Sequence, residues 1–267
     1  MSFRPLLSLS ALLAISGASA ATACGSDETS PAPSPADAGA DTSIGPVGAN
    51  EAKQTGRIVR AVENVSVGGA TVSIAGKTAT TNDDGFYEIV VPKDTPYRMS
   101  VTAEEHYKLN EQEWILKSDT LARGDTSLLG TSIANILASF LPNRDAAKGL
   151  LVVRINPLPP CDSEQGATLS LDPPGDSKVT YFAGGRPNPT ASFVTKDETF
   201  SAAIYDVTPN TNVKVVVNSP LCEEVPFPVD YQNVTYTGNQ QTEPGEVLSY
   251  IRVFIGPKKA PVDAGAD

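Results

Sequence analysis

The strongest constraint on the fold is the segment from Gly69 to Ala103, in which three runs of alternating residues are separated by turn residues. The runs are GATVSI, FYEIVVP and YRMSVTA, and the second follows directly after Asn-Asp-Asp-Gly. Alternation with a period of two is typical of β-strands. The tetrapeptide that ends at Gly85 is typical of a tight turn, because Asp bonds nearby backbone and glycine adopts positive φ without strain. The sequence therefore predicts β-strands connected by short turns.

The central run carries apolar side chains on both of its faces. Phe and Val lie on one face of residues 86–91, and Tyr, Ile and Val lie on the other. A strand inside a two-layer sandwich has this pattern. The acids of the preceding turn could instead belong to a calcium loop, but the spaced D-x-D-x-D-G oxygens and a later bidentate Glu are missing. The turn interpretation is therefore favoured over a metal site.

The order of these segments resembles that of a known domain family. GRIV (56–59), GATVSI, TTNDDGFYEIVVP and YRMSV follow one another as in the carboxypeptidase regulatory-like domain, a transthyretin-like β-sandwich also grouped with carbohydrate-binding-like folds. The resemblance covers about Thr55 to Lys117, and it departs from the family at residues 103–107, where the family tends to have a Gly before the Tyr. Such domains lie beside a peptidase or on a surface protein and are not catalytic. The resemblance implies a fold and a location, but no activity.

A second set of segments repeats this order further along the chain. The set consists of GLLVVRI (149–155), GATLSL (166–171) and residues 192–217, and it lacks the Asn-Asp-Asp-Gly turn. A final alternating strand is predicted at residues 247–255. We therefore expect an all-β chain with two tandem Greek-key, transthyretin-like β-sandwich domains, at residues 54–118 and 149–256.

The expected linker between these domains, residues 119–148, contains a change to helical spacing. Asp125 or Thr126 could cap the start of a helix, and Pro142 would end it. The apolar residues at helical spacing are Leu129, Ile133, Ile136, Leu137 and Phe140. The opposite face has no Lys or Arg, which an interfacial membrane helix would carry. We therefore predict a short amphipathic helix within residues 125–141 that packs on the sandwiches.

Residues 1–23 have the features of an export signal. A basic start is followed by an almost continuously apolar run at 6–15 and then by small residues. The run is too short to span a bilayer. Two cleavage sites fit the sequence: an A-x-A site that ends at Ala20, and a lipoprotein site in which small residues precede Cys24. A lipoprotein signal peptide is the favoured interpretation because of the cysteine count.

The chain contains three cysteines, and an odd number in an exported protein requires an explanation. If Cys24 is lipidated, Cys161 and Cys222 remain as a pair that an oxidising compartment would join in a disulfide. The alternatives are a free thiol at Cys24, an intermolecular bridge, or two buried thiols in place of the disulfide. We favour lipidation, which provides a stable membrane anchor. Gly25, in place of Asp after the lipidated residue, favours the outer membrane by the usual bacterial sorting pattern.

Residues 24–53 and 257–267 are predicted to be a disordered tether and a disordered tail. The string DAGAD occurs in both, at 37–41 and 263–267. Segments of this composition bury too little apolar surface to offset the entropy of ordering. The net charge of the chain is −11. This charge argues against nucleic acid as a partner, because phosphate binding needs clustered Lys and Arg.

Two isolated residues could belong to a site. Trp114 is expected in the core of the first domain, with a sugar-binding surface as the alternative, because aromatic faces stack on sugars. His106 lies beside Glu104 and Glu105. Neighbours on a strand point to opposite faces, so we predict no metal site there. The sequence also contains no H-E-x-x-H, G-x-S-x-G or glycine-rich phosphate motif, and we predict no catalytic or cofactor-binding residues.

These features favour a non-catalytic protein of the outer membrane or cell surface. Its sandwiches would act as a binding or spacer module, with the membrane as a partner through a lipid on Cys24. A glycan, a cell-wall polymer or an envelope protein would be the further partner. The alternative is an exported hydrolase of the carboxypeptidase type, or an accessory subunit of one, and only the family resemblance supports it.

Overall fold

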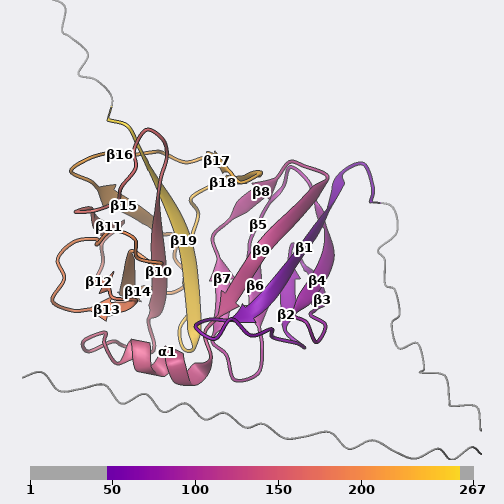
Figure 1. Cartoon of the computed structure of the whole chain (residues 1–267), viewed down its shortest axis with the longest axis horizontal. Coiled ribbons are helices and arrows are strands. Elements are labelled where there is room, and N and C mark those ends of the chain that lie inside the picture. The colour runs from indigo at the N-terminus through magenta and orange to yellow at the C-terminus, as the bar shows by residue number, and fades with distance from the viewer. Residues whose placement is uncertain (1–46, 259–267) are drawn as a thin grey trace, which may run out of the picture. The chain divides into compact units, whose positions relative to one another are not determined.

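The computed structural model describes residues 47–258 and is shown in Figure 1. Within this range the chain forms nineteen β-strands and one short helix, so the predicted all-β fold class is confirmed. The predicted signal peptide at 1–23, Cys24, and most of the predicted tether and tail lie outside the described residues. The tether was predicted to extend to residue 53, which is wrong for residues 51–53, because they pair with residues 90–92 at the start of the first strand.

The first nine strands precede the helix. They are β1 (Glu51–Arg60), β2 (Thr71–Ile74), β3 (Lys77–Thr80), β4 (Phe86–Pro92), β5 (Pro96–Tyr97), β6 (Met99–Thr102), β7 (Lys108–Glu111), β8 (Trp114–Leu116) and β9 (Thr120–Leu128). The helix is α1 (Thr131–Ala138). The remaining strands are β10 (Gly149–Pro157), β11 (Thr168–Asp172), β12 (Lys178–Ala183), β13 (Arg186–Asn188), β14 (Ala202–Val207), β15 (Lys214–Asn218), β16 (Glu223–Glu224), β17 (Val229–Tyr231), β18 (Val234–Tyr236) and β19 (Val247–Gly256).

The predicted turn before β4 is confirmed. Gly85 has a φ of +78°, and its N–H donates to the carbonyl oxygen of Asn82 over 2.8 Å. The Asn82 side chain accepts a hydrogen bond from the N–H of Phe86 over 2.9 Å. The two strands on either side of this turn, β3 and β4, belong to different sheets. It carries the chain from one layer of the sandwich to the other.

Strand β4 itself corrects one expectation. Tyr87, Ile89 and Val91 are buried, whereas Phe86 is 55% exposed. The prediction that both faces of this strand are buried is therefore wrong for one face. The physical reason is that β4 is the edge strand of a three-stranded sheet, ordered β4-β1-β9, whose inner face alone meets the core. The apolar residues of the outer face remain at the surface.

The largest sheet runs through both halves of the chain. Its strand order is β13-β12-β14-β10-β19-β7-β6-β2-β3, with β16 paired to the far end of β19. Strand β19 is parallel to β10 on one side and to β7 on the other. Figure 1 shows it, in yellow, between these two strands. The predicted final strand at 247–255 is thus confirmed, and it joins the two halves by backbone hydrogen bonds.

Strand β19 also separates two cores, because alternate residues point to opposite faces of a sheet. Ile251, Val253 and Ile255 belong to the core that lies under the two-stranded sheet β11-β15. Phe254 belongs to the other core, together with residues of the sheet β4-β1-β9, and Tyr250 packs against that core. The two sandwiches therefore lie on opposite faces of one continuous sheet.

A hairpin from the second half of the chain completes the first core. Strands β17 and β18 form a four-stranded sheet with β8 and β5, in the order β17-β18-β8-β5. The ring of Phe254 lies 5.2 Å from that of Tyr231 and 5.6 Å from that of Tyr236, centroid to centroid. Residues late in the chain thus pack against strands of the first half.

The helix is shorter than predicted. It begins at Thr131 with Gly130 as N-cap and has no side-chain cap, so the predicted capping by Asp125 or Thr126 is wrong. The reason is that residues 120–128 form β9, which pairs in parallel with β1. That long-range pairing outweighs the local helical spacing. Ala134 is the one buried residue of the helix.

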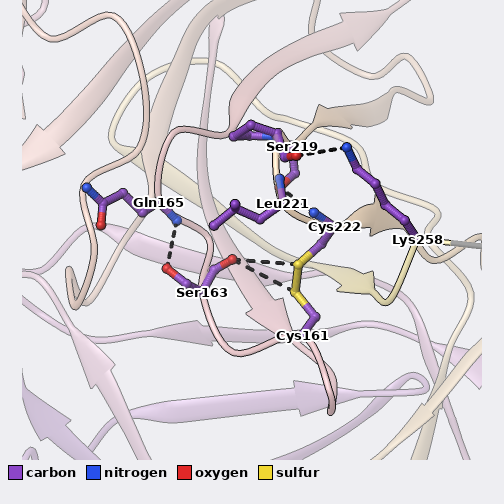
Figure 2. The surroundings of a disulfide bond; sticks show 8 residues. Cys161, Ser163, Gln165, Ser219, Leu221, Cys222 and Lys258 are labelled. Atoms are coloured by element: carbon purple, nitrogen blue, oxygen red, sulfur yellow. Dashed lines mark hydrogen bonds between the residues drawn. A yellow bond between two sulfur atoms is a disulfide. The ribbon is translucent and has the colours of Figure 1, made fainter.

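The predicted disulfide between Cys161 and Cys222 is confirmed (Figure 2). The two Cα atoms lie 6.1 Å apart, within the range that the bond requires. The bridge joins the loop after β10 to the loop between β15 and β16. Both cysteines are buried in the second core. The carbonyl oxygen of Ser163 lies 3.8 Å from each sulfur.

Candidate binding cleft

An apolar hollow of about 320 Å³ lies beneath α1. Its walls come from the helix, β10, the segment around β12 and β13, and the strand β14. Four small residues are among its lining, Ala134 and Ala138 on the helix, Ala203 on β14 and Gly185 between β12 and β13. The larger lining side chains are Tyr107, Leu129, Leu137, Leu141, Leu150, Val152, Phe182, Phe200 and Leu248. The helix thus covers the sheet without filling the space above it.

Two features mark the edge of the hollow, a hydrogen bond and an exposed valine. The hydroxyl of Tyr107 donates to the Asn135 side chain over 2.7 Å, which ties the helix to the start of β7. Val62 also lines the hollow, is 82% exposed and has a φ of +78°. This backbone conformation is strained for a β-branched residue. The loop after β1 therefore holds an apolar side chain at the opening.

A second and more polar cavity, here called the polar cleft, adjoins this hollow. Its volume is about 760 Å³, and it is lined by Arg154, Asn156, Tyr231 and residues 159–164 beside the disulfide. Both cavities share Glu198 and Thr199. Val152 of the hollow and Arg154 of the polar cleft are two residues apart and so lie on the same face of β10. This face of β10 is therefore apolar where it lines the hollow and cationic where it lines the polar cleft.

Four carboxylates line the polar cleft, and two of them have structural roles. Glu198 accepts hydrogen bonds from the N–H groups of Gly184 and Gly185 over 2.6 and 2.9 Å, which stabilises the turn between β12 and β13. Glu164 accepts one from the N–H of Asp197 over 3.3 Å. The other two carboxylates are those of Asp162 and Asp197. Within residues 47–258, no three His, Cys, Asp or Glu side chains are grouped to hold a metal ion.

A buried ion pair lies inside the first core. Arg123 donates to both carboxylate oxygens of Glu111, over 2.7 and 2.9 Å. The guanidinium lies 5.4 Å from the centre of the Trp114 ring. Burial alone would lower the pKa of Arg123, but the charge and hydrogen bonds of Glu111, together with Tyr87 and Tyr236, outweigh burial and the pKa is raised. The two parallel hydrogen bonds give this pair the geometry of a structural ion pair.

The residues singled out in the sequence lie apart from these cavities, except for Cys161. Trp114 is 1% exposed and packs edge-on against Tyr97 at 4.7 Å, so its expected place in the core is confirmed. The ring of His106 lies 2.6 Å from the carbonyl oxygen of Glu104 through Nδ1. Cys161 lines the polar cleft as part of the disulfide. Cys24 lies outside the described residues.

Arg154 of the polar cleft and its neighbour Arg252 were missed at the sequence level. Arg154 is the one charged residue in LLVVRIN, and Arg252 is the one charged residue in SYIRVFI. A single charge within an otherwise apolar strand is a usable signal, since an unpaired charge is costly to bury. The two arginines are also direct neighbours in the register of β10 and β19.

Comparisons with known proteins identify no family. No family model and no curated protein match the sequence. A mutant type II cohesin–X-dockerin complex from Acetivibrio cellulolyticus aligns over 29% of this chain and 56% of that chain, with 18% identity and a TM-score of 0.22. A shaft pilin from Lactobacillus rhamnosus GG aligns over 79% and 99%, with 11% identity and a TM-score of 0.23. A DUF3823 family protein from Bacteroides ovatus aligns over 72% and 98%, with 8% identity and a TM-score of 0.25.

The chain spans 56% of the cohesin–X-dockerin chain, 34% of a Bacillus anthracis TIE protein and 64% of a streptococcal ancillary pilin. The helix α1, the one helix between residues 47 and 258, has eight residues and is not long and apolar enough to cross a membrane.

Proposed function

We propose that this chain is a non-catalytic protein of the cell envelope, anchored in the outer membrane by a lipid on Cys24. Its β-sandwiches, at 54–118 and 149–256, form a rigid binding or spacer module for a glycan, a cell-wall polymer or an envelope protein. The first is of the carboxypeptidase regulatory-like type.

The position of β19 carries this proposal. It pairs in parallel with β7 through residues 247–250 and with β10 through residues 249–255. A hinge between the halves would have to break these ladders, and each buried backbone group left unpaired is costly. A chain built in this way holds its two ends at a constant separation, which a spacer requires.

The remaining features agree with an exported binding module. The disulfide is of the kind that persists in oxidising compartments. The adjoining hollow and polar cleft offer a concave surface with apolar, cationic and anionic parts. The chain has a single histidine, which lies outside both cavities. A binding role therefore suits the surface better than acid–base catalysis.

Lipid anchoring is tested by Cys24→Ala. The variant should lose labelling by a fatty acid and should move from the membrane fraction to the soluble exported fraction. The control is the double variant Cys161→Ser/Cys222→Ser, which should keep its label. A Cys24→Ala chain that still fractionates with membranes would show that the anchor is elsewhere and would favour cleavage after Ala20.

The spacer role is tested by a distance measurement in the exported chain. Spin labels at Thr78 and Thr211, which are both exposed, report on the two halves. Pulsed electron resonance should give one narrow distance distribution. A broad distribution would mean that the halves move independently and that the module is not a rigid spacer.

A further inference from the structure

Arg154 and Arg252 form a pair of adjacent cations without anionic partners. They are register partners on the parallel strands β10 and β19, so their side chains leave the same face of the sheet. Neighbouring strands lie about 4.8 Å apart. Among the ion pairs of residues 47–258, neither guanidinium has a carboxylate partner. In a chain with 31 acids and 20 bases, this placement is not explained by a shortage of carboxylates.

Two buried amides beside Arg252 add unpaired donors. The Asn156 side-chain oxygen accepts a hydrogen bond from Nη1 of Arg252 over 3.3 Å, and the Gln112 side-chain oxygen accepts one from the Arg252 backbone N–H. These bonds determine the orientation of both amides, because a flipped amide would present a donor to a donor. Asn156 is 6% exposed and Gln112 is 2% exposed. Their NH₂ groups have no acceptor within the described residues.

Arg252 is also held in position. Its guanidinium lies 5.4 Å from the centre of the Tyr250 ring, and its Nη1 donates to the Asn156 side chain over 3.3 Å. Arg154 and Asn156 line the polar cleft, and Arg252 lines an adjoining cavity of about 440 Å³. Arg252 and the two amides are therefore ordered before any ligand arrives, which lowers the entropic cost of binding.

The other groups of the polar cleft define the rest of the ligand. Asp162 and Asp197 are exposed acceptors, and Tyr231 contributes an aromatic ring. A simple inorganic anion would pair with the guanidiniums alone and would leave the aspartates and the ring without a partner. A sugar acid satisfies all three, with its carboxylate on the guanidiniums, its hydroxyls donating to the aspartates and its apolar face against the ring.

We propose that the polar cleft binds an acidic saccharide, of the uronate type, whose carboxylate lies on Arg154 with Arg252 and Asn156 behind it. This names the ligand class for the binding role proposed above and rests on that role. The lipid anchor and the rigid sheet do not depend on it.

The experiment is calorimetric titration of the full-length chain, purified after export, with trigalacturonate. Binding is expected for the wild type, and Arg154→Gln should weaken it at least tenfold. Because Arg154 is exposed, this change should leave the fold intact. Arg252→Gln should weaken binding to a similar extent. The matched control is Arg60→Gln, an exposed arginine on β1 that pairs with Glu63, which should change binding less than twofold.

Two further ligands distinguish the class. Neutral trigalactose should bind at least tenfold more weakly than trigalacturonate, and inorganic phosphate should not compete. Absence of trigalacturonate binding, an equal loss in Arg60→Gln, or competition by phosphate would each overturn the acidic-saccharide site. If trigalacturonate fails to bind while Cys24→Ala still loses its lipid label, the site is wrong while the proposed envelope role stands.

Discussion

Gly85 offers the sharpest test of how the first sandwich is built. Its φ of +78° is strained for any residue with a Cβ, at a cost of about 1–2 kcal/mol. A Cβ at this position would also overlap the backbone carbonyl oxygen of Ile58. That carbonyl cannot retreat, because it accepts a hydrogen bond from Val67 over 3.0 Å, while the Ile58 N–H donates to Gly85 over 2.8 Å. Overpacking of this kind adds about 1–3 kcal/mol.

Gly76 is the matched control within the same sandwich. Its φ is +76°, and a Cβ there would meet nothing within 4 Å. Gly76→Ala should therefore cost only the conformational strain of about 1–2 kcal/mol, and Gly85→Ala should cost roughly 2–5 kcal/mol. In a chain of this size, each 1 kcal/mol lowers the melting temperature by about 2–4 °C. Denaturant titration and thermal unfolding should both rank the two variants in this order.

Asparagine separates the two costs, because it tolerates positive φ far better than alanine. Gly76→Asn should be close to the wild type in its free energy of unfolding. Gly85→Asn should remain destabilised by about 1–3 kcal/mol, since its Cβ still meets Ile58. Equal losses at both positions, or recovery of Gly85→Asn to the wild-type value, would refute the close approach of the turn to β1.

Three further changes probe the cores and the surface. Glu111→Gln should lower the free energy of unfolding by about 1–3 kcal/mol in denaturant titration, because the largely buried Arg123 guanidinium loses its charged partner. Adding Arg123→Met should restore much of the loss, and a loss that this second change fails to reduce would contradict the prediction. Reduction of the bridge between Cys161 and Cys222 should cost about 4 kcal/mol, and thiol titration of the denatured, unreduced chain should find neither sulfur free. The pKa of Glu243 is lowered, since hydrogen bonds from Lys108 and Asn110 outweigh its burial. The ionised Glu243 side chain therefore stabilises the fold above about pH 4.3, and this contribution is lost as the pH falls further. Glu243→Gln should make the free energy of unfolding depend less on pH in this acidic range. An unchanged pH dependence would show that this carboxylate is not coupled to folding.

Local features of the fold were predictable because they depend on neighbouring residues. The turn that ends at Gly85 requires a residue without a Cβ, and the alternation of β19 marks a strand whatever its partners are. The helix was predicted too long because residues 125–128 fit a helical spacing and a strand equally well. The parallel pairing of β9 with β1 decided between them.

The candidate cleft depends on pairings between distant segments. Arg154 and Arg252 are each conspicuous in their own strands, but their proximity follows only from the parallel register of β10 and β19. The side-chain NH₂ groups of Asn156 and Gln112 point away from Arg252 because the oxygens of both amides accept hydrogen bonds from Arg252. The spacing of these residues in the sequence does not predict these contacts.

The sequence by itself determined the strand content, the turn at Gly85 and the pairing of Cys161 with Cys222, since these follow from alternation, glycine conformation and cysteine parity. Only the tertiary structure decided that β19 lies between β10 and β7 and that its two faces serve two different cores. The physical reason is that backbone N–H and C=O groups are the same in every strand. Partner choice is therefore made by the packing of whole faces, which is a property of the assembled chain.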